Sequence, residues 1–402
     1  MRRSGIERLP ANCRAGQDAD SSIVASLGRV AVSQGTVARS TGGKIMVTIT
    51  GGRNERMTAR PTMRDVAQAA GVSTMTVSRV INGEPMVLPE TAARVEQAIR
   101  RLGYQRNDAA RRLRRQGQRT QTIGVLVDDL ANPFFAALAA AVEGNARLHD
   151  YVVLIGSSAD SIRREREVVA AFSARQVDGL IIVPVAGSHR FLRSQISLGT
   201  KIVCVDRPAE ILNVDSVLAD NRTGARRAVS HLLEQGHRRI GYLGDYERIW
   251  TAQERFAGFC DAFADLGTEP DPELVRHCTP TNRGMGAELT AALLKLANPP
   301  TALFTSNDVM TMGAINALAD QGGRIALVGF DEFALADKLT PPVTVVAQDP
   351  TAMGAAAAQL LFARIAGDTS PARELIFKPQ LLIRGSGEIP PERAAERRER
   401  QR

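Results

Sequence analysis

From residue 122 to about residue 349 the chain alternates between short apolar runs and stretches of helix length, such as 135–148 and 163–175. Near-continuous apolar runs are typical of parallel strands buried on both faces, and the stretches between them have the length of crossover helices. The runs are 123–129, 151–157, 179–185 and 201–207, followed by 239–245, a strand around 274–278, 301–308, 325–331 and 344–349. The pattern predicts two doubly wound α/β lobes made of parallel sheets flanked by helices.

Before the lobes, residues 63–82 read MRDVAQAAGVSTMTVSRVIN, which favours two short helices joined by a tight turn. Ala67 lets the helices approach closely, Gly71 accepts the positive φ of a sharp helix end, and Val77 fills the gap between them. Ser73 is the expected N-cap of the second helix, with its hydroxyl accepting from the Thr76 amide. This geometry is a helix-turn-helix.

The second of these helices has an apolar stripe of Val77, Val80 and Ile81 and an opposite face of short polar side chains with one arginine. Such a face can enter a major groove and hydrogen-bond to base edges. A solvated surface is the alternative for the same face. The residues of the face are Thr74, Met75, Ser78, Arg79 and Asn82.

A third helix is expected from Pro89 to a stop at Gly103, with Val95, Ala98, Ile99 and Leu102 turned inward. An arginine-rich segment with one leucine, 107–115, follows. It is either a solvated charge run or a hinge between the helical domain and the lobes. Residues 1–60 lack hydrophobic periodicity and are expected to be a disordered leader, in which Met46 and Met57 are plausible alternative starts.

Positive charge is concentrated in the first part of the chain. Lys and Arg exceed Asp and Glu by 10 to 4 in residues 1–62 and by 11 to 5 in residues 63–119, whereas residues 120–386 carry 30 acidic against 25 basic side chains. The front of the molecule is therefore expected to meet a polyanion such as DNA, and the acidic remainder to do something else.

Other sequence features limit the possible functions. No apolar run approaches the eighteen or so residues of a membrane span, and no secretory signal is recognisable, so a cytoplasmic protein is expected. The four cysteines have no C-x-x-C pair and no zinc spacing, which predicts neither a disulfide nor a metal site. There is no G-x-S-x-G, P-loop or H-E-x-x-H motif, and the five histidines are scattered, so an enzyme is not expected and no cofactor is predicted.

Taken in order, the motifs of residues 61–386 resemble the lactose-repressor (LacI/GalR) family of bacterial transcriptional regulators. The resemblance rests on DVAQAAGVSTMTVSRVIN, LGYQRNDAARRL, ANPFF, VDGLII, VDRP, HLLEQGHRRIGYLG, RFAGF, SNDVMTMGA and VGFDE. It implies a DNA-binding headpiece, a hinge helix and a periplasmic-binding-protein-like core whose cleft holds a small effector.

By this resemblance, Thr74, Met75, Ser78 and Arg79 fall where such proteins read the major groove. Leu113 falls where a hinge leucine enters the minor groove and bends the DNA, and the arginines around it would neutralise phosphates. The complete set of expected DNA-binding residues is Ser73, Thr74, Met75, Thr76, Ser78, Arg79, Asn82, Asn107, Arg111 and Leu113.

The resemblance also places a set of effector-binding residues at strand ends and helix starts of the core, where α/β folds bind ligands. Carboxylate, amide and guanidinium groups provide complementary donors and acceptors for a polyol. Each residue has a structural alternative: Asn307 could cap a helix, Asp206 could pair with Arg207, and the two phenylalanines could be core. The expected residues are Asn132, Phe134, Phe135, Asp206, Arg255, Asn307 and Asp331.

Several positions depart from the family pattern. Thr279 stands where many members have a ligand-stacking aromatic residue, the segment 320–324 is short, and Leu88 replaces a polar helix cap. The tail has no leucine heptad, so a homodimer on a palindromic operator is expected rather than a tail-zipped tetramer. The remaining alternative is a solute sensor of the same fold that does not act through DNA.

The expected domains are the leader at 1–60, the headpiece at 61–106, the hinge and linker at 107–119, the core at 120–386 and a charged tail at 387–402. Within the core, the first lobe comprises about 120–218 and 348–377, and the second comprises about 219–347 and 378–386.

Overall fold

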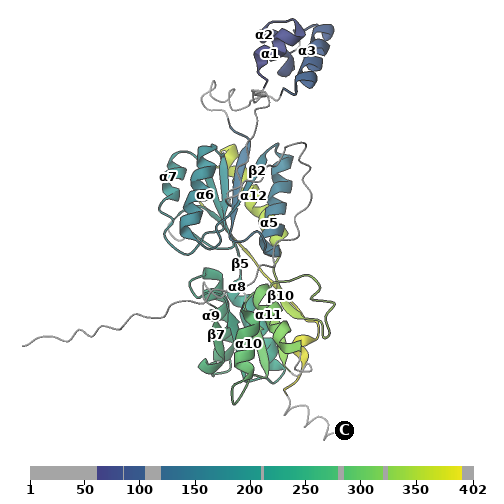
Figure 1. Ribbon diagram of the computed structural model, residues 1–402. Coiled ribbons are helices and arrows are strands. Elements are labelled where there is room, and N and C mark those ends of the chain that lie inside the picture. Colours follow the sequence, from purple (N-terminus) through teal and green to yellow (C-terminus); the bar gives the residue numbers. More distant parts are fainter. Residues whose placement is uncertain are drawn as a thin grey trace, which may run out of the picture. The chain divides into compact units, whose positions relative to one another are not determined.

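The structure, a computed structural model, describes residues 61–84, 86–104, 119–209, 212–278, 285–319 and 325–391. The chain divides into two compact units, Met1–Asn107 and Asp108–Arg402. The helical headpiece belongs to the first unit and the α/β core to the second (Figure 1).

The headpiece has three helices, α1 (Met63–Ala70), α2 (Thr74–Ile81) and α3 (Pro89–Leu102). Thr62 and Asp65 form a capping box at the start of α1. Gly71 ends α1 with φ 67°, and the Ser73 hydroxyl accepts from the Thr76 amide at 3.1 Å, so both predictions for this turn are confirmed. Gly103 ends α3 in the same left-handed conformation, with φ 62°.

One small cluster holds the three helices together. Its buried members come from all three helices, and the half-buried Val80, Ile81, Ile99 and Leu102 pack around them. In α2 only Val77 is fully buried, so the predicted stripe of that helix is present but narrow. The buried residues are Val66, Ala67, Ala70, Val77, Val95 and Ala98.

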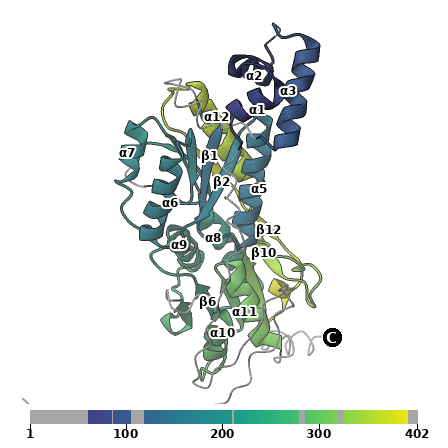
Figure 2. The same ribbon diagram turned by 45° about the horizontal axis from the view of Figure 1, so that its top comes forward.

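The core consists of two lobes, each built on a six-stranded sheet (Figures 1 and 2). The first-lobe sheet has the order β11-β5-β4-β3-β1-β2 and the second-lobe sheet the order β12-β10-β9-β8-β6-β7. The described strands are β1 (Thr122–Val127), β2 (Val152–Ser157), β3 (Gly179–Ile182), β4 (Lys201–Val205), β5 (Asp215–Ala219), β6 (Ile240–Gly244), β7 (Val275–His277), β8 (Ala302–Thr305), β9 (Ala326–Phe330), β10 (Thr344–Ala347), β11 (Glu374–Phe377) and β12 (Gln380–Leu382).

Helices cover both faces of each sheet. In the first lobe α5 and α12 lie on one face and α6 and α7 on the other, as Figure 2 shows, and α8 and α9 face α10 and α11 across the second sheet. The described core helices are α5 (Pro133–Leu148), α6 (Ile162–Ala174), α7 (Leu192–Ser197), α8 (Asn221–Glu234), α9 (Trp250–Ala264), α10 (Gly286–Leu294), α11 (Asp308–Leu318) and α12 (Pro350–Ala366).

Alternate residues of the central strands enter opposite cores, which explains the continuous apolar runs of the sequence. In β3, Ile181 packs under α5 and α12, whereas Leu180 and Ile182 pack under α6 and α7. In the second lobe, Phe304 lies in the core under α8 and α9, and its neighbour Leu303 lies in the core under α10 and α11. Burial on both faces is what doubly wound parallel strands require.

The chain crosses between the lobes after β5, after β10 and between β11 and β12. The parallel pairings of β1, β3 and β4 and of β6, β8 and β9 bring the carboxyl ends of the strands to one edge of each sheet. These two edges face the crossings. The loops that follow the strands are therefore the parts of each lobe closest to the other.

The strands differ from their predicted bounds mainly at their carboxyl ends. The runs ending at 129, 185, 207 and 308 were predicted too long, since β1, β3, β4 and β8 end at Val127, Ile182, Val205 and Thr305. The polar residues after them form loops, and Asp206 and Asp331 take positive φ values of 68° and 71°, which no strand tolerates. Strands β5, β11 and β12 were not predicted from the sequence; β11 and β12 are short strands at the sheet edges with exposed or half-buried side chains.

In the part of the chain that the structure describes, no helix is long and apolar enough to span a membrane. Among the same residues, no group of three or more His, Cys, Asp or Glu side chains is arranged to hold a metal ion.

Candidate functional site

The first candidate surface is the outward face of α2 in the headpiece. Packing leaves Thr74, Met75 and Asn82 exposed, and Ser78 and Arg79 partly exposed. Met75 is 63% exposed although its side chain is apolar. Packing in the headpiece core therefore accounts for the apolar side chain at Val77, but it does not account for the apolar side chain at Met75.

Hydrogen bonds order part of this face. The Ser73 hydroxyl is 2.9 Å from that of Thr76, so both residues serve the start of α2. Arg79 makes a salt bridge with Glu84 at 3.7 Å, with both side chains nearly half exposed. An exposed pair of this kind is weak and leaves the guanidinium available to another acceptor.

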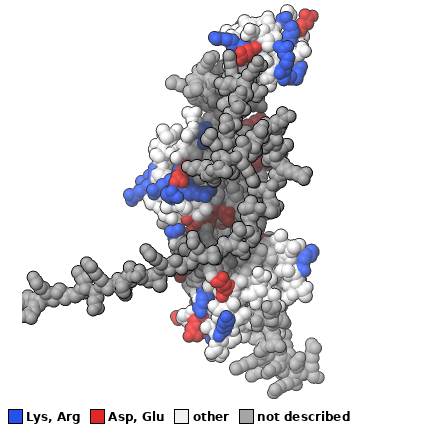
Figure 3. All heavy atoms as spheres, in the orientation of Figure 1, with Lys and Arg blue, Asp and Glu red and all other residues white. Residues whose placement is uncertain are grey.

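Charge on the described headpiece is mixed, as Figure 3 shows for its visible face. Residues 61–104 contain five arginines and four acidic residues, so the basic excess predicted for 63–119 comes from the segment after residue 104. That segment includes Asn107, Arg111 and Leu113, and these three predicted DNA contacts lie outside the described residues.

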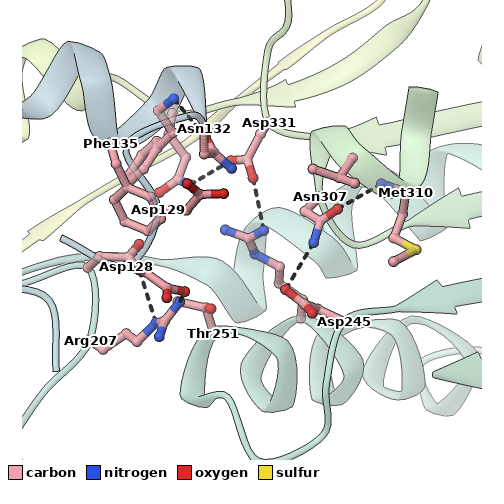
Figure 4. A pocket seen from close by; sticks show the side chains of 15 residues that line it. Asp128, Asp129, Asn132, Phe135, Arg207, Asp245, Thr251, Asn307, Met310 and Asp331 are labelled. Atoms are coloured by element: carbon pink, nitrogen blue, oxygen red, sulfur yellow. Dashed lines mark hydrogen bonds and ion pairs between the residues drawn. The ribbon is translucent and has the colours of Figure 1, made fainter. Parts of the chain in front are cut away.

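The second candidate site is a cavity of about 250 Å³ between the two lobes of the core. All seven predicted effector residues line it: Asn132, Phe134, Phe135, Asp206, Arg255, Asn307 and Asp331. Figure 4 shows lining residues of both lobes converging on this cavity, with Asn132 and Phe135 from the first lobe and Asn307 and Asp331 from the second. The structure thus brings together residues that lie as far apart in the sequence as Asn132 and Asp331.

Arg255 holds the second-lobe wall of the cavity. It is buried on α9 and donates to the Asn221 side chain at 2.8 Å, to the Ser306 carbonyl at 2.5 Å and to Asp331 at 3.0 Å. Its guanidinium also lies 3.8 Å from the centre of the Phe330 ring. These contacts fix the orientation of the Asp331 carboxylate, whose other oxygen accepts from Gln348 at 2.6 Å.

Asn307 begins α11 and also lines the cavity. Its side-chain oxygen accepts from the Met310 amide at 2.8 Å, so the structural alternative of a helix cap is correct. Its amide nitrogen donates to Asp245 at 3.0 Å, and this turns the group toward the cavity (Figure 4). Capping and lining the cavity are compatible, because each uses a different atom.

The first-lobe wall is organised around Arg207. Its guanidinium donates to Asp128 at 3.1 Å and pairs with Asp206 at 3.4 Å, so the predicted alternative of an Asp206–Arg207 pair is also correct. Burial opposes the charge on Arg207, but the carboxylates of Asp206 and Asp128 outweigh it and raise the pKa of the guanidinium. Burial raises the pKa of Asp206 despite the nearby arginine.

Asn132, Phe134 and Phe135 form the opposite part of the first-lobe wall. Asn132 caps α5 by accepting from the Phe134 amide at 2.8 Å, and its amide nitrogen lies 3.4 Å from Asp308 of the second lobe. Phe135 belongs to the buried core and Phe134 packs against it, so the alternative of core residues is partly correct. Both rings still contribute apolar surface to the cavity.

Sequence reasoning missed eight residues of the lining: Asp128, Asp129, Arg207, Asp245, Thr251, Val309, Met310 and Gln348. Five of these, Asp128, Asp129, Arg207, Asp245 and Gln348, follow a strand directly or within two residues, which is the signal that could have identified them. Thr279 and the segment 320–324, where departures from the family pattern were noted, lie outside the described residues.

Comparisons with known proteins agree with this architecture. Residues 62–107 match the family described as bacterial regulatory proteins, lacI family, and residues 229–387 match a periplasmic binding protein-like domain. The chain is 33% identical over 332 residues to the transcriptional repressor CytR of Escherichia coli K12, covering 81% of this chain and 96% of CytR. It is 31% identical over 330 residues to the ribose operon repressor of Haemophilus influenzae, covering 81% and 98%.

Solved structures of transcriptional regulators also superpose on this chain. The lac repressor dimer bound to operator and the anti-inducer ONPF superposes with a TM-score of 0.70 at 25% identity, covering 82% of this chain and 99% of that one. The complex of the transcriptional regulator CelR with cellobiose superposes with a TM-score of 0.60 at 30% identity, covering 81% and 100%.

Proposed function

This chain belongs to the lacI family of bacterial regulatory proteins and is a DNA-binding transcriptional regulator, and we propose that a neutral, sugar-like effector in the interlobe cavity switches its affinity for an operator. The observation that carries this proposal is the convergence of all seven predicted effector residues on one cavity. The protein then acts as a regulatory binding protein in the cytoplasm, without turnover of the effector.

The charge of the cavity indicates the class of effector. Five aspartates and two arginines line it, so it carries an excess of carboxylates. An anionic sugar acid or sugar phosphate would be repelled, whereas a neutral polyol can donate its hydroxyls to these carboxylates. Phe134 and Phe135 supply an apolar wall of the kind that packs against ring carbons. Two similar proteins, the ribose operon repressor of Haemophilus influenzae and CelR in its complex with cellobiose, support the same class.

Operator recognition is assigned to the face of α2. Thr74, Met75, Ser78 and Arg79 would contact base edges, while Ser73 and Thr76 would fix the start of the helix against the backbone of the DNA. Leu113 would enter the minor groove, with Asn107 and Arg111 beside it. Two chains would form a homodimer that places two headpieces on a palindromic site about one helical turn apart.

Coupling between effector binding and operator affinity follows from the position of the cavity between two lobes. An effector that contacts both lobes favours the arrangement in which both sets of contacts form, and it can change operator affinity only by its different affinity for the two states. Contacts such as Asn132 with Asp308 cross this boundary already. The effector therefore acts on an equilibrium between lobe arrangements.

The test has two stages. A duplex selected from a random pool by the full-length protein serves as the operator, and its binding is measured by fluorescence anisotropy with and without neutral monosaccharides and disaccharides. At least one of these sugars is expected to raise the melting temperature and to change operator affinity, and Asp331→Ala is expected to remove both effects.

Three results would contradict the proposal. A sugar that binds without changing operator affinity would favour a solute sensor. A chemical change in the bound sugar would favour an enzyme. Retention of the thermal shift by Asp331→Ala would place the effector at another site.

A further inference from the structure

A second cavity lies beside the first and is also formed by both lobes. Its volume is about 140 Å³. The first lobe contributes the loop after β3 and the loop after β4, and the second lobe contributes the segment that begins α9. The lining includes His189, Arg207, Pro208, Arg248, Trp250 and Gln253.

Arg207 is the residue that the two cavities share. One terminal nitrogen of its guanidinium donates to Asp128, which lines the first cavity. Within the described residues, the other terminal nitrogen, Nη1, and Nε are buried without a hydrogen bond, although Nη1 lies 4.0 Å from Asp160 and Nε lies 3.4 Å from Asp206. Both nitrogens face carboxylates, which hold the guanidinium in its orientation between the two cavities.

His189 provides a further polar group in the lining of the second cavity. It is 4% exposed, and its Nε2 lies 3.2 Å from the buried Glu165 without hydrogen-bond geometry. Every basic residue of this lining has a carboxylate near it: Glu165 for His189, and Asp160 for both Arg207 and Arg248. No surplus positive charge is left for an anion, so the cavity suits a neutral group with hydroxyls.

Trp250 gives the second cavity an aromatic wall and is the only tryptophan of the chain. An aromatic wall with a few polar groups is the composition of a small-molecule subsite, and the first cavity repeats it with its phenylalanines. Arg248 stacks on Tyr246 at 4.6 Å and pairs with Asp160 of the first lobe at 3.6 Å. The second cavity is thus bounded by a contact that joins the lobes.

We propose that the effector has two ring units, as a disaccharide does, and that its second ring occupies this cavity against Trp250 while its first ring occupies the cavity lined by Asp331. This inference rests on the proposed function, which assigns a neutral sugar to the first cavity. It adds a second subsite and makes Trp250 and Gln253 residues that determine the length of the ligand.

The experiment uses full-length protein and a fixed set of probes: cellobiose, lactose, maltose and trehalose with their constituents glucose and galactose. Binding is measured by calorimetry, and the fluorescence of Trp250 is recorded in the same titrations. One disaccharide is expected to bind at least about tenfold more tightly than either constituent and to change the Trp250 emission, whereas the monosaccharides leave that emission unchanged.

Variants then separate the two subsites. Trp250→Ala and Gln253→Ala are expected to lower the affinity for the disaccharide to that for the monosaccharide and to leave monosaccharide binding intact. Glu254→Ala changes the neighbouring residue on α9, which lines neither cavity, and serves as the matched control. Asp331→Ala is expected to abolish binding of both kinds of sugar.

The outcomes distinguish this inference from the function on which it rests. Equal affinity for monosaccharides and disaccharides, or no effect of Trp250→Ala on disaccharide affinity, overturns the second subsite and leaves the proposed function standing. If no sugar of the set binds, the neutral-sugar effector and the second subsite are both overturned.

Discussion

Asn307 shows how a single residue of this protein can satisfy two explanations. Its oxygen caps α11 and its amide nitrogen reaches Asp245 in the cavity. Arg207 is similar, because it neutralises buried carboxylates and also lies between two cavities. At the residue scale, a structural role therefore does not exclude a ligand contact, provided that the two use different atoms.

Met75 allows a prediction about DNA recognition. Its side chain is 63% exposed, so Met75→Ala should leave the melting temperature unchanged. If Met75 contacts a base, the variant should lose about 1 to 3 kcal/mol of operator binding, measured by anisotropy. Met86→Ala removes a similarly exposed methionine outside α2 and is the control. Equal operator affinities for wild type and Met75→Ala would remove Met75 from the interface.

Asp308 gives a prediction about pH. Burial, with a further contribution from Asp331, raises the pKa of its carboxyl to about 6. The folded state therefore holds this proton more tightly than the unfolded chain, so the contribution of Asp308 to stability is greatest at low pH and is lost as pH rises from about 4 through 6. Asp308→Asn has no carboxyl group to ionise at this position, so it should not lose this stability as the pH rises.

The measurement is the free energy of unfolding of both proteins from pH 4 to pH 7.5. The advantage of Asp308→Asn over wild type should grow with pH by up to about 3 kcal/mol, the equivalent of a two-unit shift. Asn132 can still donate to the new side chain. Parallel pH profiles for the two proteins would contradict the assignment.

At the scale of elements, close helix packing in the core depends on small residues. A Cβ added at Gly258 on α9 would lie 2.1 Å from the Arg222 carbonyl oxygen of α8. Because that neighbour is backbone, it cannot move without separating the two helices. The exposed pairs Arg222–Asp261 and Arg226–Asp265 join the same helices and would be disturbed as well.

Gly258→Ala should therefore lower the free energy of unfolding by about 1 to 3 kcal/mol. Gly144 on α5 is the matched control, since nothing lies within 4 Å of its added Cβ. Gly144→Ala should stabilise the protein by about 0.5 to 1 kcal/mol because alanine loses less backbone entropy in a helix. Denaturant unfolding measures both, and a neutral Gly258→Ala would show that α8 and α9 can move apart.

At the scale of the whole molecule, both lobes expose apolar side chains that the monomer does not use. Leu148, Val152 and Ile155 are exposed at the end of α5 and on the edge strand β2 of the first lobe, and Met312 is exposed on α11 of the second. Exposed apolar groups of this kind are typical of surfaces that meet a partner. We expect them to lie in the homodimer interface.

Sedimentation equilibrium checks this expectation. Wild type should be a dimer, and Ile155→Glu or Met312→Glu should shift it to monomer and weaken operator binding on the order of a hundredfold, because one headpiece no longer assists the other. Leu198→Glu changes an exposed leucine after α7, outside this set of residues, and should leave the dimer intact. Dimers that persist in both α11 and β2 variants would place the interface elsewhere.

Local sequence alone determined the headpiece helices and most strands of the core, but not β5, β11 and β12. Ser73, Gly71 and Val77 specify the turn between α1 and α2 through contacts within a few residues, and the buried strands specify themselves by their apolar runs. The family resemblance then selected seven cavity residues. The predictions of the turn, the helix caps and the central strands succeeded because caps and strand burial depend on near neighbours and on side-chain polarity.

Only the tertiary structure decided which strand ends meet. Asp128, Asp245 and Gln348 each follow a strand directly, but this local signal does not say which strand ends lie together. They join one cavity because the parallel sheets bring their carboxyl ends to the boundary between the lobes. The second cavity beside Arg207 and Trp250 arises in the same way. Such contacts join residues far apart in sequence, so they follow from the topology of the sheets and the packing of the two lobes.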